Sequence, residues 1–217
     1  ELKTPMTSIK VLADSLVGQE NVPVELYQEF MQDITVEIDR ENKIITDLLS
    51  LVKLDKKAAD LNIAEVDINE MLENILKRLN PIASVKHVEL VLESFRPVVA
   101  EIDEVKLSLA FSNLIENGIK YNVENGYVHV KLDADHKYFF VTVTDSGIGI
   151  PEESIDKIFE RFYRVDKSHS REIGGTGLGL AIARKLIELQ GGTLSFESIQ
   201  GKGTKFILHI SFEISAE

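Results

Sequence analysis

The most informative absence in this sequence of 217 residues is cysteine, of which there is none. Without cysteine the chain can form no disulfide, no thiol nucleophile and no thiolate metal site. The five histidines are scattered, and no two of them stand at the spacing of a metal-binding pair. These absences exclude cysteine chemistry and zinc-type centres from the functions that the sequence can support.

An excess of positive charge and a long apolar run are also missing. The net charge is −12, and because a phosphate backbone would repel such a chain, we expect no nucleic-acid partner. No apolar stretch approaches the ~20 residues that a membrane-spanning helix needs, so we expect no direct membrane contact from this segment. A hydrophobic fraction of 44% with 28% charged residues is ordinary for a globular protein.

Helical periodicity fills the first 58 residues. A first set of apolar residues recurs at steps of three and four: Leu2, Met6, Ile9, Ala13 and Leu16. Residues 18–23 break the pattern, and a second helix is predicted over residues 24–57, about 50 Å long at ~1.5 Å per residue. Its seam is close to the heptad period: Tyr27, Phe30, Ile34, Ile38, Glu41, Ile45, Leu48 and Val52.

A helix of that length exposes much of its seam when it packs only on a short partner. Two such hairpins could bury their seams in a four-helix bundle, which predicts a homodimer through the helical hairpin. The alternative is a hairpin that packs onto the rest of its own chain.

After about residue 58 the pattern becomes mixed. Strands are predicted at 63–68, 88–93, 98–102, 127–132, 138–144, 193–198 and 204–212, and helices at 69–85, 103–122 and 176–190. This order predicts an α+β chain: a helical hairpin over residues 1–58 and a two-layer α/β sandwich over residues 59–217.

Polar residues gather on one arc of the helix predicted at 103–122. Asn113, Asn117, Lys120 and Tyr121 lie four, three and one residues apart, beside an apolar arc that should face the sheet. Amide oxygens are hard ligands suited to Mg²⁺, and a lysine can balance phosphate charge. The plain alternative is a solvated helix face.

Two glycine-containing segments follow. In the first, a β-rich strand ends at Asp145, Gly147 and Gly149, where a carboxylate could accept a hydrogen bond from an exocyclic amine such as that of adenine. In the second, the run from Gly174 to Leu180 leads into a helix, whose N-terminal N–H groups favour phosphate. A simple turn and a flexible loop with a capped helix are the alternatives.

Between the two glycine segments lies the sequence Phe159-Glu-Arg-Phe162-Tyr163-Arg164. A long polar connection with an aromatic anchor is what a lid over a ligand needs. Aromatic residues that only anchor the connection to a core would look the same.

The order of these elements is more specific than any one of them. Asn-x-x-x-Asn-x-x-Lys-Tyr, Asp-x-Gly-x-Gly, Phe-x-x-Phe and Gly-x-Gly-x-Gly resemble the N, G1, F and G2 boxes of bacterial sensor histidine kinases. The segment from Gly201 to Phe206 resembles the G3-like element of the same ATP pocket. The resemblance covers essentially the whole chain and implies the Bergerat ATP-binding fold, which DNA gyrase and MutL share.

The resemblance also implies roles for individual residues. Asn117 and Asn113 would hold Mg²⁺, Lys120 would contact phosphate, and Asp145 would bind the adenine amine. The complete ATP-binding set that it implies is Asn113, Asn117, Lys120, Tyr121, Asp145, Gly147, Gly149, Arg164, Gly175, Thr176, Gly177, Leu178, Gly179 and Thr204. ATP-hydrolysing relatives carry a glutamate at the position of Asn113, and an amide cannot act as a general base, which favours phosphoryl transfer over hydrolysis. Glu116 falls at an open motif position and is expected at the surface.

The opening residues, Glu1-Leu-Lys-Thr4-Pro5, resemble the phosphoacceptor box His-Glu-x-x-Thr-Pro without its histidine. By this resemblance Glu1 would take a proton from the attacking imidazole, and Thr4 would orient water when a response regulator is dephosphorylated. We therefore expect a fragment of a kinase that binds Mg-ATP but cannot phosphorylate itself.

The implied partners are a second copy of the chain and a response-regulator receiver domain, and the implied location is the cytoplasmic region of a membrane-anchored receptor. Two alternatives remain at this stage, a GHKL-type ATPase and a nucleotide-gated dimeric scaffold.

Overall fold

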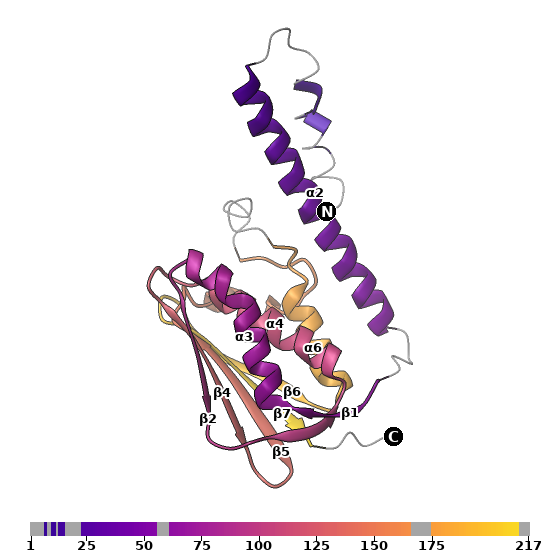
Figure 1. Ribbon diagram of the computed structural model, residues 1–217, viewed down its shortest axis with the longest axis vertical. Helices are drawn as coiled ribbons and strands as arrows, with labels where there is room; N and C mark the ends of the chain where they lie inside the picture. The colour runs from indigo at the N-terminus through magenta and orange to yellow at the C-terminus, as the bar shows by residue number, and fades with distance from the viewer. Residues whose placement is uncertain are drawn as a thin grey trace.

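A long helix and a compact α/β body make up the computed structural model, which describes residues 7, 10, 11, 13–15, 23–55, 61–165 and 175–212. Helix α2 (Val24–Asp55) is the long rod, and it extends well beyond the α/β body in Figure 1. Its bounds agree with the predicted second helix to within two residues. Most of the predicted first helix and of the break that follows it lies outside the described residues.

A five-stranded mixed sheet forms one layer of the body. Its strands are β2 (Glu89–Ser94), β4 (Tyr127–Ala134), β5 (Tyr138–Asp145), β7 (Gly203–Ser211) and β6 (Thr193–Ile199), and they lie in that spatial order. The β2–β4 pair is parallel and the other pairs are antiparallel. The predicted strands are therefore confirmed, but two of them do not join this sheet: β1 (Ala64–Asp67) and β3 (Val99–Ile102) pair only with each other.

Three helices form the second layer. Figure 1 shows α3 (Ile68–Val85), α4 (Glu104–Lys120) and α6 (Gly179–Leu189) over one face of the five-stranded sheet. The apolar arc predicted for α4 faces inward, since each of its members is fully buried: Leu107, Ala110, Phe111, Leu114 and Ile115. Asp103 begins α4 by accepting a hydrogen bond from the N–H of Lys106, which satisfies one of the unpaired donors of the first turn.

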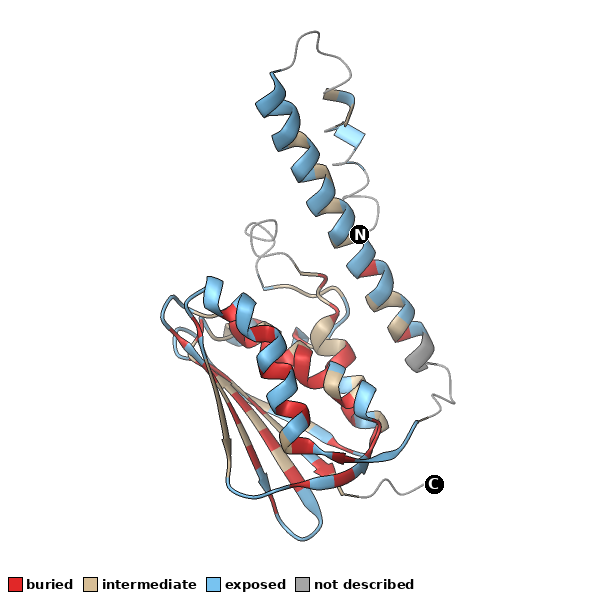
Figure 2. Cartoon of the chain, viewed as in Figure 1, coloured by how far each residue is buried: buried red, intermediate tan, exposed pale blue. Residues whose placement is uncertain are grey.

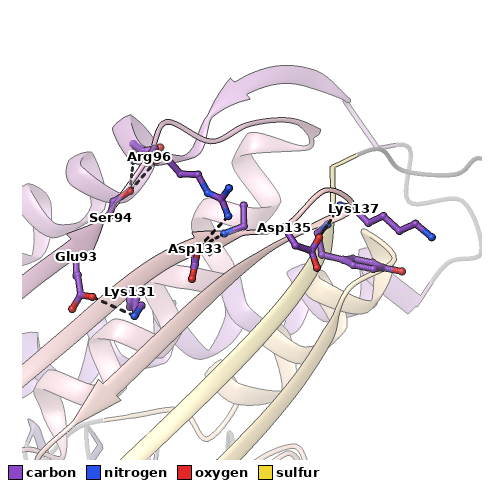
Figure 3. Close-up of polar contacts among 10 residues, drawn as sticks. Glu93, Ser94, Arg96, Lys131, Asp133, Asp135 and Lys137 are labelled. Carbon is purple, nitrogen blue, oxygen red and sulfur yellow. Dashed lines mark hydrogen bonds and ion pairs between the residues drawn. The ribbon is translucent and has the colours of Figure 1, made fainter.

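Burial alternates along the strands, so that one face of the sheet is packed and the other is polar. In β5 every second residue is buried, among them Phe139, Val141 and Val143. Figure 2 shows buried positions as red bands that alternate along the strands. Figure 3 shows polar pairs around β2 and β4, where Glu93 lies 3.3 Å from Lys131 and Arg96 lies 3.3 Å from Asp133.

The predicted two-layer α/β fold with a helical N-terminal region is confirmed. The sequence pattern missed the short 3₁₀ helix η1 (Glu152–Lys157), because about two turns are too short to show periodicity. Within the described ranges, no helix combines the length and apolar character that a bilayer span requires.

Candidate ATP-binding site

Two adjoining cavities lie beside α4. The outer cavity, of about 530 Å³, is bounded by α2, α4 and the glycine loop that precedes α6. The inner cavity, of about 430 Å³, is bounded by α4, the end of β5 and β7. Both are lined by a shared set of residues: Asn117, Tyr121, Ile158, Tyr163, Arg164 and Leu180. The two cavities therefore form one elongated site that can accommodate a ligand with two chemically different ends.

Asp145 lies at the base of the inner cavity, at the last position of β5. It is buried, and its Oδ1 accepts hydrogen bonds from the backbone N–H of Gly147 at 2.9 Å and of Thr204 at 3.2 Å. Burial raises the pKa of this carboxyl, and the two backbone donors offset part of that rise. Within the described residues Oδ2 receives no hydrogen bond, which leaves one oxygen of a fixed carboxylate available to a ligand donor.

Gly147 is required by the close approach of two backbone segments. A Cβ at this position would lie 2.3 Å from the carbonyl oxygen of Tyr121, far inside van der Waals contact. The same segments are joined by the hydrogen bond from the N–H of Ile148 to the Tyr121 oxygen at 3.0 Å. The turn that holds Asp145 is thereby fixed to the end of α4.

The rest of the inner cavity is largely apolar. Its walls include a set of aliphatic and aromatic side chains that the sequence analysis did not assign: Ile148, Ile150, Pro151, Val165 and Phe206. Flat apolar walls with one carboxylate at the base suit a heteroaromatic ring that carries an exocyclic amine. These residues were missed because isolated aliphatic side chains carry no motif.

Asn113 and Asn117 project from α4 into the outer cavity. The Nδ2 atom of Asn113 is buried and has no hydrogen-bond partner within the described residues. Amide oxygen and nitrogen have nearly the same shape, so a flipped amide would present an oxygen at the same place. A buried, unpartnered amide in a polar cavity fits the ligand chemistry of Mg²⁺.

Lys120 is the last residue of α4, and it lines the outer cavity with Arg164, Lys43 and Lys86. Burial lowers its pKa to about 8, with further contributions from those three cations and an opposing one from Glu116. Its ammonium lies 5.5 Å from the centre of the Tyr121 ring. Because these positive charges repel one another, a ligand whose negative charge neutralises them is favoured.

The glycine loop is interlocked with the segment that precedes it. Gly177 has a φ of +71°, and a Cβ there would lie 2.8 Å from the carbonyl carbon of Phe162. The N–H of Phe162 donates to the oxygen of Gly177 at 2.9 Å, and Nη1 of Arg164 donates to the oxygen of Gly175 at 2.6 Å. The loop therefore turns sharply where only glycine fits.

Helix α6 begins at Gly179 beside the outer cavity. Leu178 occupies its N-cap position, is fully buried, and provides no side-chain hydrogen bond to the first turn. The first N–H groups and the positive end of the helix dipole are thus unshielded by a capping side chain, which suits a phosphate group.

The two threonines of the predicted set are both buried. Thr204 lines the inner cavity, donates its N–H to Asp145, and shares a hydrogen bond of 2.9 Å with Ser198. Thr176 lines the outer cavity, and its hydroxyl donates to Oδ2 of Asp47 on α2 at 2.7 Å.

Helix α2 supplies a wall of the outer cavity that the sequence did not reveal. Asp47 and Lys43 both line it, and Nζ of Lys43 lies 3.5 Å from Oε2 of Glu116. Burial raises the pKa of Asp47, and the hydrogen bond from Thr176 offsets part of that rise. Glu116, which was expected at the surface, is 38% exposed at its side chain, and it also lines the cavity and pairs with α2, which its sequence position did not indicate.

Two family models match the chain. The model described as "Histidine kinase-, DNA gyrase B-, and HSP90-like ATPase" matches residues 102–214, and the model described as "His Kinase A (phospho-acceptor) domain" matches residues 1–57. The chain belongs to the sensor histidine kinases. The first match covers α4 and every glycine segment that surrounds the two cavities, whereas α2, which forms a wall of the outer cavity, lies within the second match.

Known kinases resemble this one along its whole length. It is 33% identical over 220 residues to the sensor histidine kinase WalK of Bacillus subtilis, covering 100% of this chain and 36% of that protein. It is 36% identical over 217 residues to the sensor protein kinase WalK of Staphylococcus saprophyticus, covering 99% of this chain and 35% of that protein. The chain thus spans about a third of the length of these curated relatives.

Among solved structures, the histidine kinase ThkA in complex with the response regulator protein TrrA is similar, with a TM-score of 0.79 and 25% identity. That match covers 97% of this kinase chain and 58% of the ThkA chain. The likeness therefore extends over α2 as well as the α/β body.

The structure brings the predicted nucleotide residues of this kinase together around the two cavities. Those that line one or both cavities are Asn113, Asn117, Lys120, Tyr121, Asp145, Gly149, Arg164, Gly175, Thr176, Gly177, Gly179 and Thr204. Gly147 and Leu178 support that lining through the backbone contacts given above. Glu1 and Thr4, the two predicted catalytic residues, lie outside the described residues, as does Gly174.

Proposed function

We propose that the chain binds Mg-ATP in the two cavities and transfers the γ-phosphoryl group to a histidine. The single observation that carries the proposal is the polarity of the site from end to end. One end is an apolar cavity with a single oriented carboxylate, Asp145, and at the other end Lys120 and Arg164 lie beside an uncapped helix N-terminus. This is the polarity of a nucleoside triphosphate.

In this proposal the adenine ring lies in the inner cavity, with its exocyclic amine donating to Oδ2 of Asp145. The phosphates extend into the outer cavity toward Lys120, Arg164 and the first turn of α6. Asn113 and Asn117 would hold Mg²⁺, which would neutralise phosphate charge when it is bound.

The phosphoryl step needs a nucleophile from the helical hairpin. A histidine nitrogen would form the new P–N bond to the γ-phosphorus as the P–O bond to ADP breaks, and Glu1 would take the second imidazole proton. We propose the same region, with Thr4, for regulator dephosphorylation. The histidine kinase ThkA has been solved in complex with a response regulator protein, which supports a receiver domain as the partner of this chain as well.

Transfer is favoured over the alternative, hydrolysis by a GHKL-type ATPase. A hydrolytic site needs a carboxylate that activates water at the position of Asn113, and an amide cannot accept that proton. A nucleotide-gated scaffold without catalysis would have no need for the phosphoacceptor-like residues that the second family model covers.

The test is an autophosphorylation assay with γ-labelled ATP on the chain extended by one histidine directly before Glu1. We expect acid-labile phosphohistidine on the extended chain, and none on the 217-residue chain itself. Asp145→Asn should abolish both labelling and ATP binding in the extended chain, because an amide presents a donor or a weaker acceptor to the adenine amine.

Asp133→Asn is the matched control, since it makes the same change at an exposed residue of β4 that lines neither ATP cavity. Equal labelling of the Asp145 and Asp133 variants would overturn the adenine assignment. An extended chain that binds ATP but never becomes labelled would overturn the transfer step.

A further inference from the structure

Helix α2 reaches the nucleotide site through a carboxylate that no kinase motif includes. Oδ2 of Asp47 accepts the hydroxyl proton of Thr176 at 2.7 Å, between residues that are 129 positions apart in the chain. One turn earlier on the same face of α2, Lys43 pairs with Glu116 of α4. Both contacts line the outer cavity, where the proposed function places the phosphates.

This face of α2 is packed, so the contacts are held in place. Ile44 is 6% exposed and Leu51 is 2% exposed, and Leu51 belongs to the main hydrophobic core of the α/β body. Ile44 and Leu51 flank Asp47 on the helix. The carboxylate is therefore fixed against the glycine loop by apolar burial on both sides.

The hydroxyl of Thr176 has only one proton to donate. Because that proton goes to Asp47, it cannot also go to a phosphate oxygen. The Thr176 oxygen already accepts the N–H of Leu178 at 3.2 Å, which fixes the hydroxyl within the loop. The docked Asp47 therefore uses the one side-chain donor that this loop could offer to a polyphosphate.

Charge acts in the same direction. A half-buried carboxylate beside the phosphates of ATP repels them more strongly than an exposed one would, since the local dielectric screens less. Asp47 therefore disfavours a bound triphosphate, whereas its hydrogen bond to Thr176 stabilises the loop when no nucleotide is bound.

We propose that Asp47 and the nucleotide phosphates compete for the glycine loop, so that docking of α2 weakens ATP binding and ATP binding releases α2. The inference rests on the proposed placement of the phosphates in the outer cavity. By thermodynamic linkage, the factor by which docked Asp47 lowers the affinity for ATP is also the factor by which bound ATP lowers the equilibrium constant for docking of α2. Asp47 is accordingly a positioning residue that couples the hairpin to the site and does not itself touch the reacting atoms.

The first experiment is calorimetric titration of the 217-residue chain with Mg-ATP and with adenosine, comparing the wild type, Asp47→Asn and Asp47→Ala. We expect Mg-ATP affinity to rise about tenfold in Asp47→Ala and by less in Asp47→Asn, because the amide can still accept from Thr176. Adenosine, which has no phosphate, should bind all three equally. Asp33→Asn, an exposed change on the same helix that lines neither ATP cavity, is the matched control.

Unchanged or weaker Mg-ATP binding by Asp47→Ala would overturn the proposal. If the binding were weaker only in the presence of Mg²⁺, the result would also identify Asp47 as a metal ligand. An equal gain for adenosine would also overturn it. A wild-type chain that binds no ATP would refute the proposed function itself, so the two failures are distinguishable.

The second experiment observes the helix directly. Because the chain has no cysteine, spin labels can be attached specifically to Gln32→Cys on α2 and Glu197→Cys on β6. We expect Mg-ATP to shift the label–label distance distribution in the wild-type background, and Asp47→Ala to show the shifted distribution without nucleotide. A distribution that Mg-ATP leaves unchanged would contradict release of α2.

Discussion

At the scale of single residues, Asp145 and Lys120 carry opposite charges at the two ends of the site, and each is perturbed by burial. Asp145 is compensated by two backbone donors that hold one of its oxygens. Lys120 is partly buried beside further cations, and Glu116 offsets only part of the resulting fall in its pKa. A partly buried cation beside like charges is typical of a phosphate site before phosphate binds.

This environment predicts pH-dependent ATP binding. The pKa of Lys120 is lowered from 10.5 to about 8, so the nucleotide-free protein loses this proton as the pH rises through about 8. Bound phosphate would stabilise the ammonium and raise its pKa, so binding should take up a proton in that range. We expect affinity to be nearly constant below pH ~8 and to fall above it by up to about tenfold per pH unit.

Calorimetry at pH ~8.5 in two buffers with different ionisation enthalpies measures the proton uptake. Lys120→Met should bind ATP weakly and without this proton uptake. A wild-type affinity that stays constant between pH 7 and 9.5 would contradict the assignment of Lys120 to the phosphates.

At the scale of elements, the site is assembled from the ends of α4, β5 and α6 together with the loops that join them. The backbone turn at Gly177 fixes the glycine loop against Phe162, which itself has the left-handed φ of +66° that is unusual for a bulky residue. Backbone strain concentrated at a loop of this kind is typical of ligand-binding segments.

Gly177→Ala should therefore damage both the fold and the site. A Cβ at Gly177 meets backbone atoms of Phe162, whereas a Cβ at Gly191, which has a similar φ of +69°, meets nothing within 4 Å. We expect Gly191→Ala to lower the free energy of unfolding by about 1 kcal/mol and Gly177→Ala by at least ~2 kcal/mol. Chemical denaturation measures both values.

ATP titration then separates the loop from general stability. We expect Gly177→Ala to lose affinity about tenfold, and Gly191→Ala to keep the wild-type value. Equal stability and affinity in the two variants would show that the loop tolerates the side chain and that the clash is relieved at no cost.

At the scale of the whole molecule, α2 has two faces with different partners. One face carries the buried residues Ile44 and Leu51, of which Leu51 belongs to the hydrophobic core of the α/β body. Another carries apolar residues seven positions apart that remain 42–55% exposed: Met31, Ile38, Ile45 and Val52. The helix therefore docks on its own chain while an apolar seam of heptad spacing stays exposed, and we expect a second copy to pack there.

The exposed seam predicts a dimer that charge can dissociate. Introducing two carboxylates with Ile38→Glu and Ile45→Glu would bury uncompensated charge in a bundle, so we expect the double variant to sediment as a monomer. Its ATP affinity should stay within about twofold of wild type, because neither residue lines the cavities.

Gln32→Glu, an exposed change off the seam, serves as the control for added charge. A wild-type chain that is monomeric at all concentrations, or a double variant that remains dimeric, would exclude this seam as the interface.

Much of the fold followed from local patterns. The apolar arc from Leu107 to Ile115 predicted the buried face of α4, because that pattern repeats with the geometry of one element. The separation of β1 and β3 from the main sheet did not follow, since strand periodicity does not specify which strand becomes the neighbour.

The sequence by itself determined the family resemblance and the motif residues that line the cavities, because the motif residues lie at fixed spacings within single elements and their adjoining turns. Only the tertiary structure placed Asp47 on Thr176 and Glu116 on Lys43. Those contacts join elements that are packed together by the collapse of a shared core, and no local spacing records which side chains such packing brings within hydrogen-bond distance. For the same reason the lowered pKa of Lys120 belongs to its surroundings and not to its place in the motif.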